Sequence, residues 1–179
     1  MITKINLIKN NVVGIIEYLD YPDVDDIIDL QNNMLTNLTN KDVFQPDTKE
    51  FIINHILKHG KIVGCKVENQ LIAYAVLRFP MYNEDNLGID IKLDNDKLKF
   101  VAHFESIVVL SDYRGNNLQQ LLCKYIETIA NHKGMKYLLA TVSPENIQSL
   151  NNFNKLGFEV KLEKIKYNGL KRYILCKAI

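Results

Sequence analysis

The segment VAHFESIVVLSDYRGNNLQQLLCKYIETI, residues 101–129, predicts a strand, a polar turn and a helix in succession. Residues 101–110 alternate between two faces, a pattern typical of a largely buried strand. One face carries Val101, His103, Glu105, Ile107 and Val109. Turn-forming residues follow at 111–117, and apolar residues then recur at helical spacing over 118–129, which predicts an amphipathic helix packed on a sheet.

A strand that leads through a loop into a helix N-terminus can bind an anion. The N–H groups of the first helical turn have no partners there, and the helix dipole is positive at that end. Phosphate is the expected ligand. An ordinary strand-to-helix turn has the same pattern, because a single glycine, Gly115, is weak evidence for a phosphate site.

Two motifs in the second half of the chain resemble the GNAT superfamily of N-acetyltransferases. Residues 107–109, Ile-Val-Val, followed by YRGNNLQQLL at 113–122, look like its acyl-CoA binding signature. SPENIQSLNNFNKLGF at 143–158 resembles its strand-to-helix motif that ends in Gly-Phe. The two motifs in this order are more specific than either alone. The first half of the chain resembles the family only in its pattern of elements.

The resemblance implies an enzyme that transfers an acetyl group from acetyl-CoA to a primary amine by direct attack on the thioester, with no metal. Pantetheine would lie along β-strand residues 107–109 as an added strand, in a splay between the strands that end near Val109 and Val142. A backbone N–H near Val109 or Leu110 would polarise the thioester carbonyl. The implied cofactor-binding residues are Ile107, Val108, Val109, Arg114, Gly115, Asn116, Asn117, Leu118, Gln119, Asn146 and Phe153.

The attacking amine must be neutral, whereas an alkyl amine with a pKa near 10.4 is largely protonated at pH 7. A base is therefore required. His103 and Glu105 are two residues apart on one strand face, and the resemblance implies a glutamate or histidines as the base on this strand. We predict Glu105 as the first choice for the catalytic base and His103 as the second. A structural role as a hydrogen-bond anchor stays open for both.

Three positions depart from the family pattern. Asn117 and Gln119 stand where glycine is usual, and Phe153 replaces a tyrosine proposed to protonate the leaving thiolate. Asn tolerates a left-handed φ, so Asn117 could hold the turn, whereas Gln119 must point away from the ligand or contact it. A thiol with a pKa near 8.5 can leave without strong acid assistance. These departures keep a second hypothesis open, a non-catalytic acyl-CoA-binding or interaction module with the same fold.

Length and composition predict one N-acetyltransferase domain over residues 1–179, because 179 residues with 47% hydrophobic composition suffice for a single core. The net charge of +1, with acids and bases interspersed, argues against nucleic acid or a membrane as partner. No apolar run reaches the length of a membrane span. Three cysteines without metal-ligand spacing fit reduced thiols and a cytoplasmic location. The sequence leaves open which small-molecule or peptide amine is the acceptor, and whether the chain is a homodimer.

An acidic run occupies the first half of the chain. From residue 17 to residue 40 there is no Lys or Arg, but there are six acids: Glu17, Asp20, Asp23, Asp25, Asp26 and Asp29. Acids are favoured at a helix N-terminus, which is the structural interpretation. The functional hypothesis is a field that attracts a cationic amine.

The remaining pattern predicts strands at 3–8, 12–18, 61–67, 71–78, 136–142, 159–167 and 171–177. Helices are expected over 24–38, from a cap at Asp47 to Gly60, and from a cap at Ser143 to Gly157. Residues 80–99 are polar and irregular, which indicates a solvated insertion. The order of elements predicts an α/β (α+β) fold with a mixed, mostly antiparallel central sheet and helices on both faces.

Overall fold

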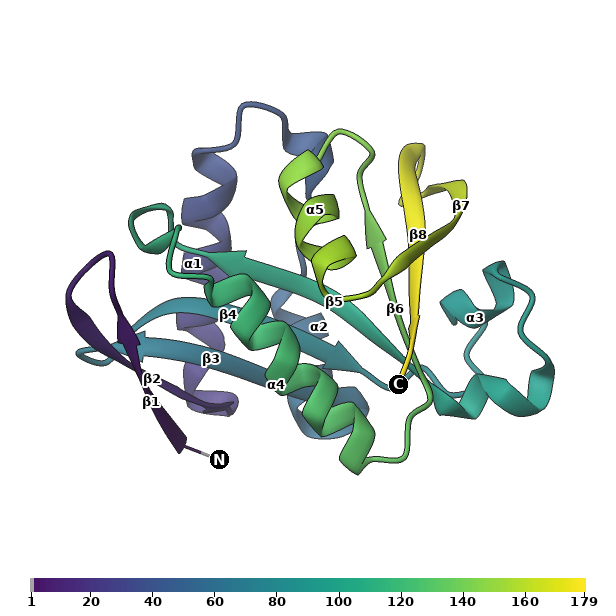
Figure 1. Ribbon diagram of the computed structural model, residues 1–179, viewed down its shortest axis with the longest axis horizontal. Coiled ribbons are helices and arrows are strands. Elements are labelled where there is room, and N and C mark those ends of the chain that lie inside the picture. The colour runs from purple at the N-terminus through teal and green to yellow at the C-terminus, as the bar shows by residue number, and fades with distance from the viewer. Residues whose placement is uncertain (1) are drawn as a thin grey trace.

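The computed structural model describes residues 2–179, which form an eight-stranded sheet with helices on both faces (Figure 1). The strands lie in the order β1-β2-β3-β4-β5-β6-β8-β7, and β5–β6 is the parallel pair among otherwise antiparallel neighbours. The predicted mixed, mostly antiparallel α/β fold is therefore confirmed. The strands are β1 Ile2–Leu7, β2 Val12–Leu19, β3 Gly60–Val67, β4 Gln70–Arg78, β5 Val101–Val109, β6 Tyr137–Val142, β7 Glu159–Lys166 and β8 Leu170–Ala178.

Two apolar layers hold the helices against the sheet. The helices are α1 Val24–Thr36, α2 Lys49–Asn54, α3 Leu87–Asp90, α4 Leu118–His132 and α5 Ile147–Lys155. Leu122 and Ile126 of α4 and Phe153 of α5 pack in one cluster with the sheet. Ile27 of α1 and Ile52 of α2 pack in a second cluster on the opposite face. The sheet thus separates an α4–α5 layer from an α1–α2 layer (Figure 1).

Strands β5 and β6 are paired over only half their length. Their register runs from Val101 opposite Tyr137 to Phe104 opposite Ala140 and stops there. Residues 105–109 of β5 therefore have no strand partner on the β6 side within the part of the chain that the structure describes. This is the splay that the family resemblance implies, and it exposes backbone groups of β5 inside the molecule.

A β-bulge interrupts β5 at the start of the splay. Glu105 and Ser106 together face the single residue Val76 of β4. Beyond the bulge, Ile107 packs with Phe104 in the α4–α5 layer. Simple alternation predicted Ile107 on the same face as Glu105, and this is wrong because the extra residue reverses the pattern. As a result, the side chains of Glu105 and Ser106 both lie on the α1–α2 side.

Two helices begin later than the sequence pattern predicts. The cap of α2 is Thr48, whose hydroxyl accepts a hydrogen bond from the Phe51 N–H at 3.1 Å, and not Asp47. The cap of α5 is Asn146, whose side-chain oxygen accepts from the Ser149 N–H at 3.1 Å, and not Ser143. Each predicted cap lies next to, or a few residues before, another residue that can also cap. The change at α2 leaves the Asp47 carboxylate free for another contact.

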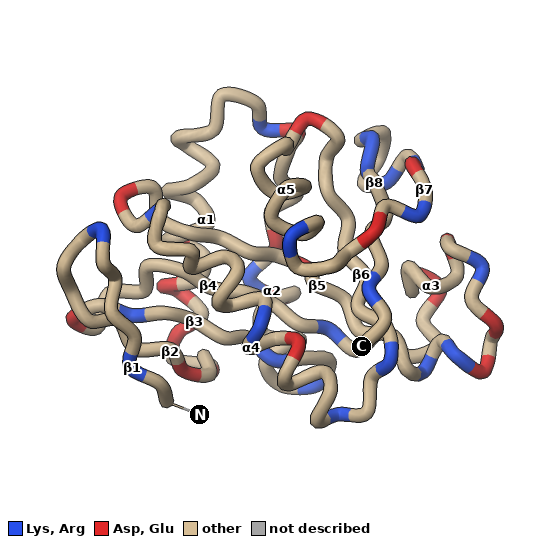
Figure 2. The backbone as a smooth tube through the Cα atoms, in the orientation of Figure 1, with Lys and Arg blue, Asp and Glu red and all other residues tan. Residues whose placement is uncertain are grey.

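Residues 80–99 form α3 and a 3₁₀ turn at one end of the sheet. The insertion is tied to the sheet through Asp90, which pairs with Lys164 and with Lys166 on β7. Outside the acidic run at 17–40, acidic and basic residues are interspersed along the chain (Figure 2). Among the described residues, no helix is long and apolar enough to cross a membrane.

Candidate active site

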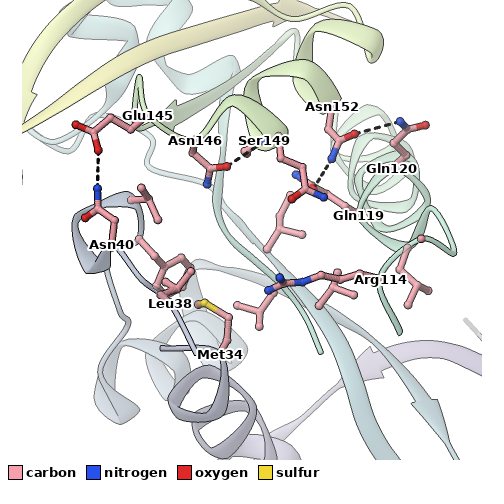
Figure 3. A pocket seen from close by; sticks show the side chains of 18 of the residues that line it. Met34, Leu38, Asn40, Arg114, Gln119, Gln120, Glu145, Asn146, Ser149 and Asn152 are labelled. Atoms are coloured by element: carbon pink, nitrogen blue, oxygen red, sulfur yellow. Dashed lines mark hydrogen bonds between the residues drawn. The ribbon is translucent and has the colours of Figure 1, made fainter. Parts of the chain in front are cut away.

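A cavity of about 480 Å³ lies where β5 and β6 separate, between the α1–α2 loop, the start of α4 and the start of α5 (Figure 3). Most of the predicted cofactor-binding residues line it, namely Ile107, Val108, Val109, Arg114, Gly115, Asn117, Leu118, Gln119 and Asn146. The sequence analysis missed the other wall, which consists of Met34, Leu38, Thr39, Asn40, Val43 and Phe44 from the end of α1 and the following loop. Periodicity marked α1 only as a packed helix, so no sequence signal pointed to this wall.

Two of the predicted cofactor-binding residues do not line the cavity, and neither do the predicted bases His103 and Glu105. Asn116 turns to the β1–β2 turn, where its amide donates to Asn10 Oδ1 at 2.7 Å and its oxygen accepts from the Lys9 N–H at 2.9 Å. Phe153 is 4% exposed and packs edge-to-face on Phe104 and Phe158 in the core. Asn116 therefore positions the loop, and Phe153 fills the layer beneath it.

The loop before α4 has the geometry of an anion site. Gly115 has φ +90° and Asn117 has φ +57°, so Asn117 holds the left-handed turn in place of a glycine. Within the described residues, the backbone N–H groups of 115–120 donate no hydrogen bond to protein. Arg114 extends its guanidinium into the cavity (Figure 3). Free N–H donors, a helix dipole and a cationic side chain converge on one end of the cavity.

The backbone of β5 offers a second set of donors. The Leu110 N–H donates to the Ile72 carbonyl of β4 at 2.8 Å, so it is already used. N–H groups alternate in direction along an extended strand, and the Val109 N–H therefore faces away from β4, into the cavity. Of the two oxyanion donors expected from sequence, Val109 is the one that is free to act.

Side-chain bridges join the walls of the cavity (Figure 3). Asn152 of α5 donates to Gln119 Oε1 at 2.6 Å and accepts from Gln120 Nε2 at 3.3 Å, which links α5 to α4. Asn40 of the α1–α2 loop donates to Glu145 of the β6–α5 turn. Gln119 thus points across to α5 instead of crowding the backbone of its own loop.

His103 is enclosed by its neighbours. It is 2% exposed, and its Nε2 accepts the Leu87 N–H at 3.1 Å. The proton of the neutral ring is therefore on Nδ1, which donates to Glu105 Oε1 at 3.3 Å. Both ring nitrogens are occupied, so His103 orients Glu105 and does not face the cavity.

Glu105 is held by the positive charge of Arg78 and by a hydrogen bond from His103. Arg78 Nη1 lies 3.4 Å from its Oε1, and Arg78 also binds Asp85 through both nitrogens at 2.7 and 2.8 Å. Burial raises the pKa of the Glu105 carboxyl, but the hydrogen bond from His103 and the charge of Arg78 outweigh this and leave the pKa below its ordinary value. Glu105 is therefore a stabilised carboxylate with a low affinity for protons.

The family model of the acetyltransferase (GNAT) family matches residues 24–158. The chain belongs to the GNAT family of acetyltransferases. No curated protein matches it closely enough to add a nearer relative. The matched range contains the cavity, both motifs of the second half and the α1–α2 wall that the sequence analysis did not assign.

Solved structures share the fold of this GNAT chain. An N-acetyltransferase from Staphylococcus aureus Mu50 has 16% identity and a TM-score of 0.70, covering 92% of this chain and 98% of its own. The ribosomal-protein-S18-alanine N-acetyltransferase of Escherichia coli has 14% identity and a TM-score of 0.69, covering 93% and 94%. The yncA structure from Salmonella typhimurium holds its cofactor acetyl-CoA, with 15% identity, a TM-score of 0.65 and coverage of 91% and 92%. At these identities the likeness shows the fold alone.

One further carboxylate of this GNAT acetyltransferase lies beside Glu105. Asp47 Oδ2 accepts the Ser106 hydroxyl at 2.5 Å, and its backbone N–H and carbonyl bind the two ends of the Gln31 amide, each at 2.9 Å. Burial raises the pKa of Asp47 to about 7, the Ser106 hydrogen bond opposes this, and the charge of Glu105 adds to it. The sequence analysis assigned Asp47 to the α2 cap and so missed it.

The acidic run lies away from the cavity. Glu17 and Asp23 bind Lys66 at 3.0 and 2.6 Å, and Asp25 pairs with Lys49. The acids lie at or before the first turns of α1, whereas the cavity begins at Met34 near its other end. Because 13 residues of α-helix span about 20 Å, this run does not face the cavity. The structural interpretation at a helix N-terminus accounts for its placement.

Among residues 2–179, no group of His, Cys, Asp and Glu is arranged to hold a metal ion.

Proposed function

We propose that this GNAT chain transfers an acetyl group from acetyl-CoA to a primary amine by direct attack of the amine on the thioester. The observation that carries the proposal is the cavity between β5 and β6, which has unpaired strand backbone along one wall and unpaired α4 N–H groups at one end. An acyl-pantetheine diphosphate needs both features. The amides of its arm pair like an added strand, and its phosphates accept N–H groups.

In this proposal the cofactor lies along residues 107–109 with its pyrophosphate over residues 114–119. Arg114 adds a charge-assisted contact to a phosphate. The Val109 N–H donates to the thioester carbonyl oxygen, on which negative charge develops as the amine attacks. The thiolate of CoA leaves without an acid from Phe153, because a thiol with a pKa near 8.5 is a good leaving group near neutral pH.

The acceptor amine must lose a proton to a base before it attacks the thioester. Glu105, with His103 beside it, stays the prediction of the sequence analysis, since the resemblance implies a carboxylate on this strand. Small amines, amino acids, peptide N-termini and lysine side chains all remain candidate acceptors. We also propose that residues 1–179 act as one domain in the cytoplasm, in support of which all eight strands share one sheet and the three cysteines are free and buried.

Acetyl-CoA is expected to bind and stabilise the full chain. A ligand at about 100 times its dissociation constant adds about 2.7 kcal/mol to the free energy of unfolding. A thermal-shift series with acetyl-CoA, CoA and 3′-dephospho-CoA measures this, and isothermal calorimetry gives the affinity. CoA release with a panel of amines then separates an enzyme from a non-catalytic acyl-CoA-binding module. The absence of both a shift and binding heat at millimolar acetyl-CoA would contradict the proposal.

Arg114→Ala is expected to weaken acetyl-CoA binding by about 1.5–3 kcal/mol, because a hydrogen bond to a charged group is lost. Lys133→Ala is the matched control, since Lys133 is an exposed cation at the other end of the same helix. The two variants differ in whether the lost charge faces the cavity. Equal affinities for both variants, measured by calorimetry, would mean that the phosphates bind elsewhere.

A further inference from the structure

We propose that Asp47, and not Glu105, receives the proton that the acceptor amine loses. The inference rests on the proposed acetyl transfer and identifies the general base of that reaction. It also implies that the acceptor amine approaches the thioester from the α1–α2 face of the sheet. Asp47 lies on that face, away from the α4 loop that would hold the phosphates.

The position of Asp47 is fixed on both sides of its peptide unit. The amide of Gln31, itself 3% exposed, accepts the Asp47 N–H and donates to the Asp47 carbonyl. Ser106 then directs the carboxylate toward β5 through its hydroxyl. The β-bulge makes this contact possible, because without the extra residue Ser106 would point to the α4–α5 side.

Within the described part of the chain, no positively charged side chain forms an ion pair with Asp47. Ser106 of β5 is in contact with its carboxylate, and the titratable groups that its charge influences are Glu105 of β5, Tyr74 of β4 and Tyr167 of the β7–β8 turn. Burial and a neighbouring negative charge both raise the proton affinity of a carboxylate. Asp47 is half-buried and lies near Glu105, and burial raises its pKa to about 7.

Glu105 has the opposite environment. The Arg78 guanidinium compensates its charge, His103 donates a hydrogen bond to it, and its pKa is lowered. A general base works best when its pKa lies near the working pH, which favours Asp47 over Glu105 at neutral pH. Glu105 then has a positioning role, because its charge helps to keep the Asp47 carboxyl basic.

Asp47 does not itself line the cavity, and in this inference it takes the proton from an amine bound there through a water molecule. Its partner Ser106 precedes the lining residues 107–109, and a strand rises about 3.3 Å per residue, so Ser106 and Val109 are separated by about 10 Å. Val43 and Phe44, from the same loop as Asp47, line the cavity too. Asp47 is also partly open to solvent, to which it can pass the proton on.

The step balances as follows. The ammonium form of the acceptor gives one proton to the Asp47 carboxylate, which later returns it to water. The nitrogen lone pair then forms the new C–N bond to the acetyl carbon, and the C–S bond breaks with its electron pair on sulfur. The second proton leaves the nitrogen for the thiolate, so the products are the amide, CoA as the free thiol and one proton in solution.

The test is the dependence of kcat on pH, with the full chain, acetyl-CoA and an amine that the wild type accepts. The wild-type rate is expected to rise with pH through a midpoint near 7. Asp47→Asn should lose at least about a hundredfold in kcat together with this rise, while its acetyl-CoA affinity stays close to that of the wild type. Asp47→Glu should recover part of the rate.

Two milder variants keep the carboxylate and shift its titration in opposite directions. Ser106→Ala removes the hydrogen bond that favours the charged form, so the midpoint should move to higher pH. Glu105→Gln removes the neighbouring negative charge, so the midpoint should move to lower pH and the rate at high pH should persist. Loss of the pH dependence in Glu105→Gln, or a wild-type profile in Asp47→Asn, would overturn the inference and leave acetyl transfer standing. A wild type that binds acetyl-CoA but acetylates no amine in the panel overturns the proposed function, and the inference with it.

Discussion

Arg78→Met is expected to lower the free energy of unfolding by about 3–5 kcal/mol, which is typical when one partner of a buried ion pair is removed. The Arg78 side chain is 13% exposed and contacts two carboxylates, of which Glu105 is 17% exposed. Without the guanidinium, Glu105 keeps a charge that only His103 stabilises, next to the carboxylate of Asp47. For a chain of this length the loss corresponds to a fall in Tm of about 6–20 °C, measurable by thermal and urea denaturation.

Two controls show whether the effect comes from the uncompensated charge. Lys61→Met removes an exposed cation from the neighbouring strand β3, and a change within about 0.5 kcal/mol is expected. Arg78→Met combined with Glu105→Gln should be more stable than Arg78→Met alone, because a neutral amide replaces the uncompensated charge. If the double variant is no more stable than the single variant, Arg78 contributes through its packing and its contact with Asp85, and not through Glu105.

The strand–turn–helix unit at 101–132 could be predicted because its signals are local. Apolar periodicity sets β5 and α4, and the tolerance of Asn for a left-handed φ correctly allowed Asn117 to hold the turn. The cavity wall formed by the end of β5 and the loop before α4 could be predicted from the same segment. Nine of the residues that the motifs implied do line the cavity, because the loop and the strand end converge on the splay.

The contact between Asp47 and Ser106 could not be predicted, because it depends on pairing between distant segments. The bulge at Glu105 and Ser106 exists only in the register with β4, and it reverses the faces of β5. Asp47 and Thr48 compete for one helix cap, and the sequence does not show that Thr48 takes it. The contact between Asp47 and Ser106 therefore depends on the β-bulge in β5 and on Thr48 capping α2. Neither feature can be recognised from the periodicity of the sequence.

The titration of Asp47 also makes the free energy of unfolding depend on pH, whether or not the protein catalyses a reaction. The pKa of its carboxyl is raised from 3.8 to about 7 in the folded chain. Below about pH 4 the group is protonated in both states and has no effect. Between pH 4 and 7 the unfolded chain releases the proton while the folded chain retains it, so the folded state loses stability as the pH rises. Above pH 7 both states are ionised and the loss is constant.

Asp47→Asn is therefore expected to become more stable relative to the wild type as the pH rises, by up to about 4 kcal/mol between pH 4 and pH 8, since one pKa unit corresponds to 1.36 kcal/mol. Urea denaturation of both proteins across this range measures the difference. Asp26→Asn, at an exposed position without an ion pair among the described residues, should show no such trend. A flat difference for Asp47→Asn would mean that Asp47 ionises like an ordinary aspartate and lacks the proton affinity that its role as base requires. A rising difference would show that the fold retains, at a cost in stability near neutral pH, a carboxyl group whose proton affinity suits the deprotonation of an amine.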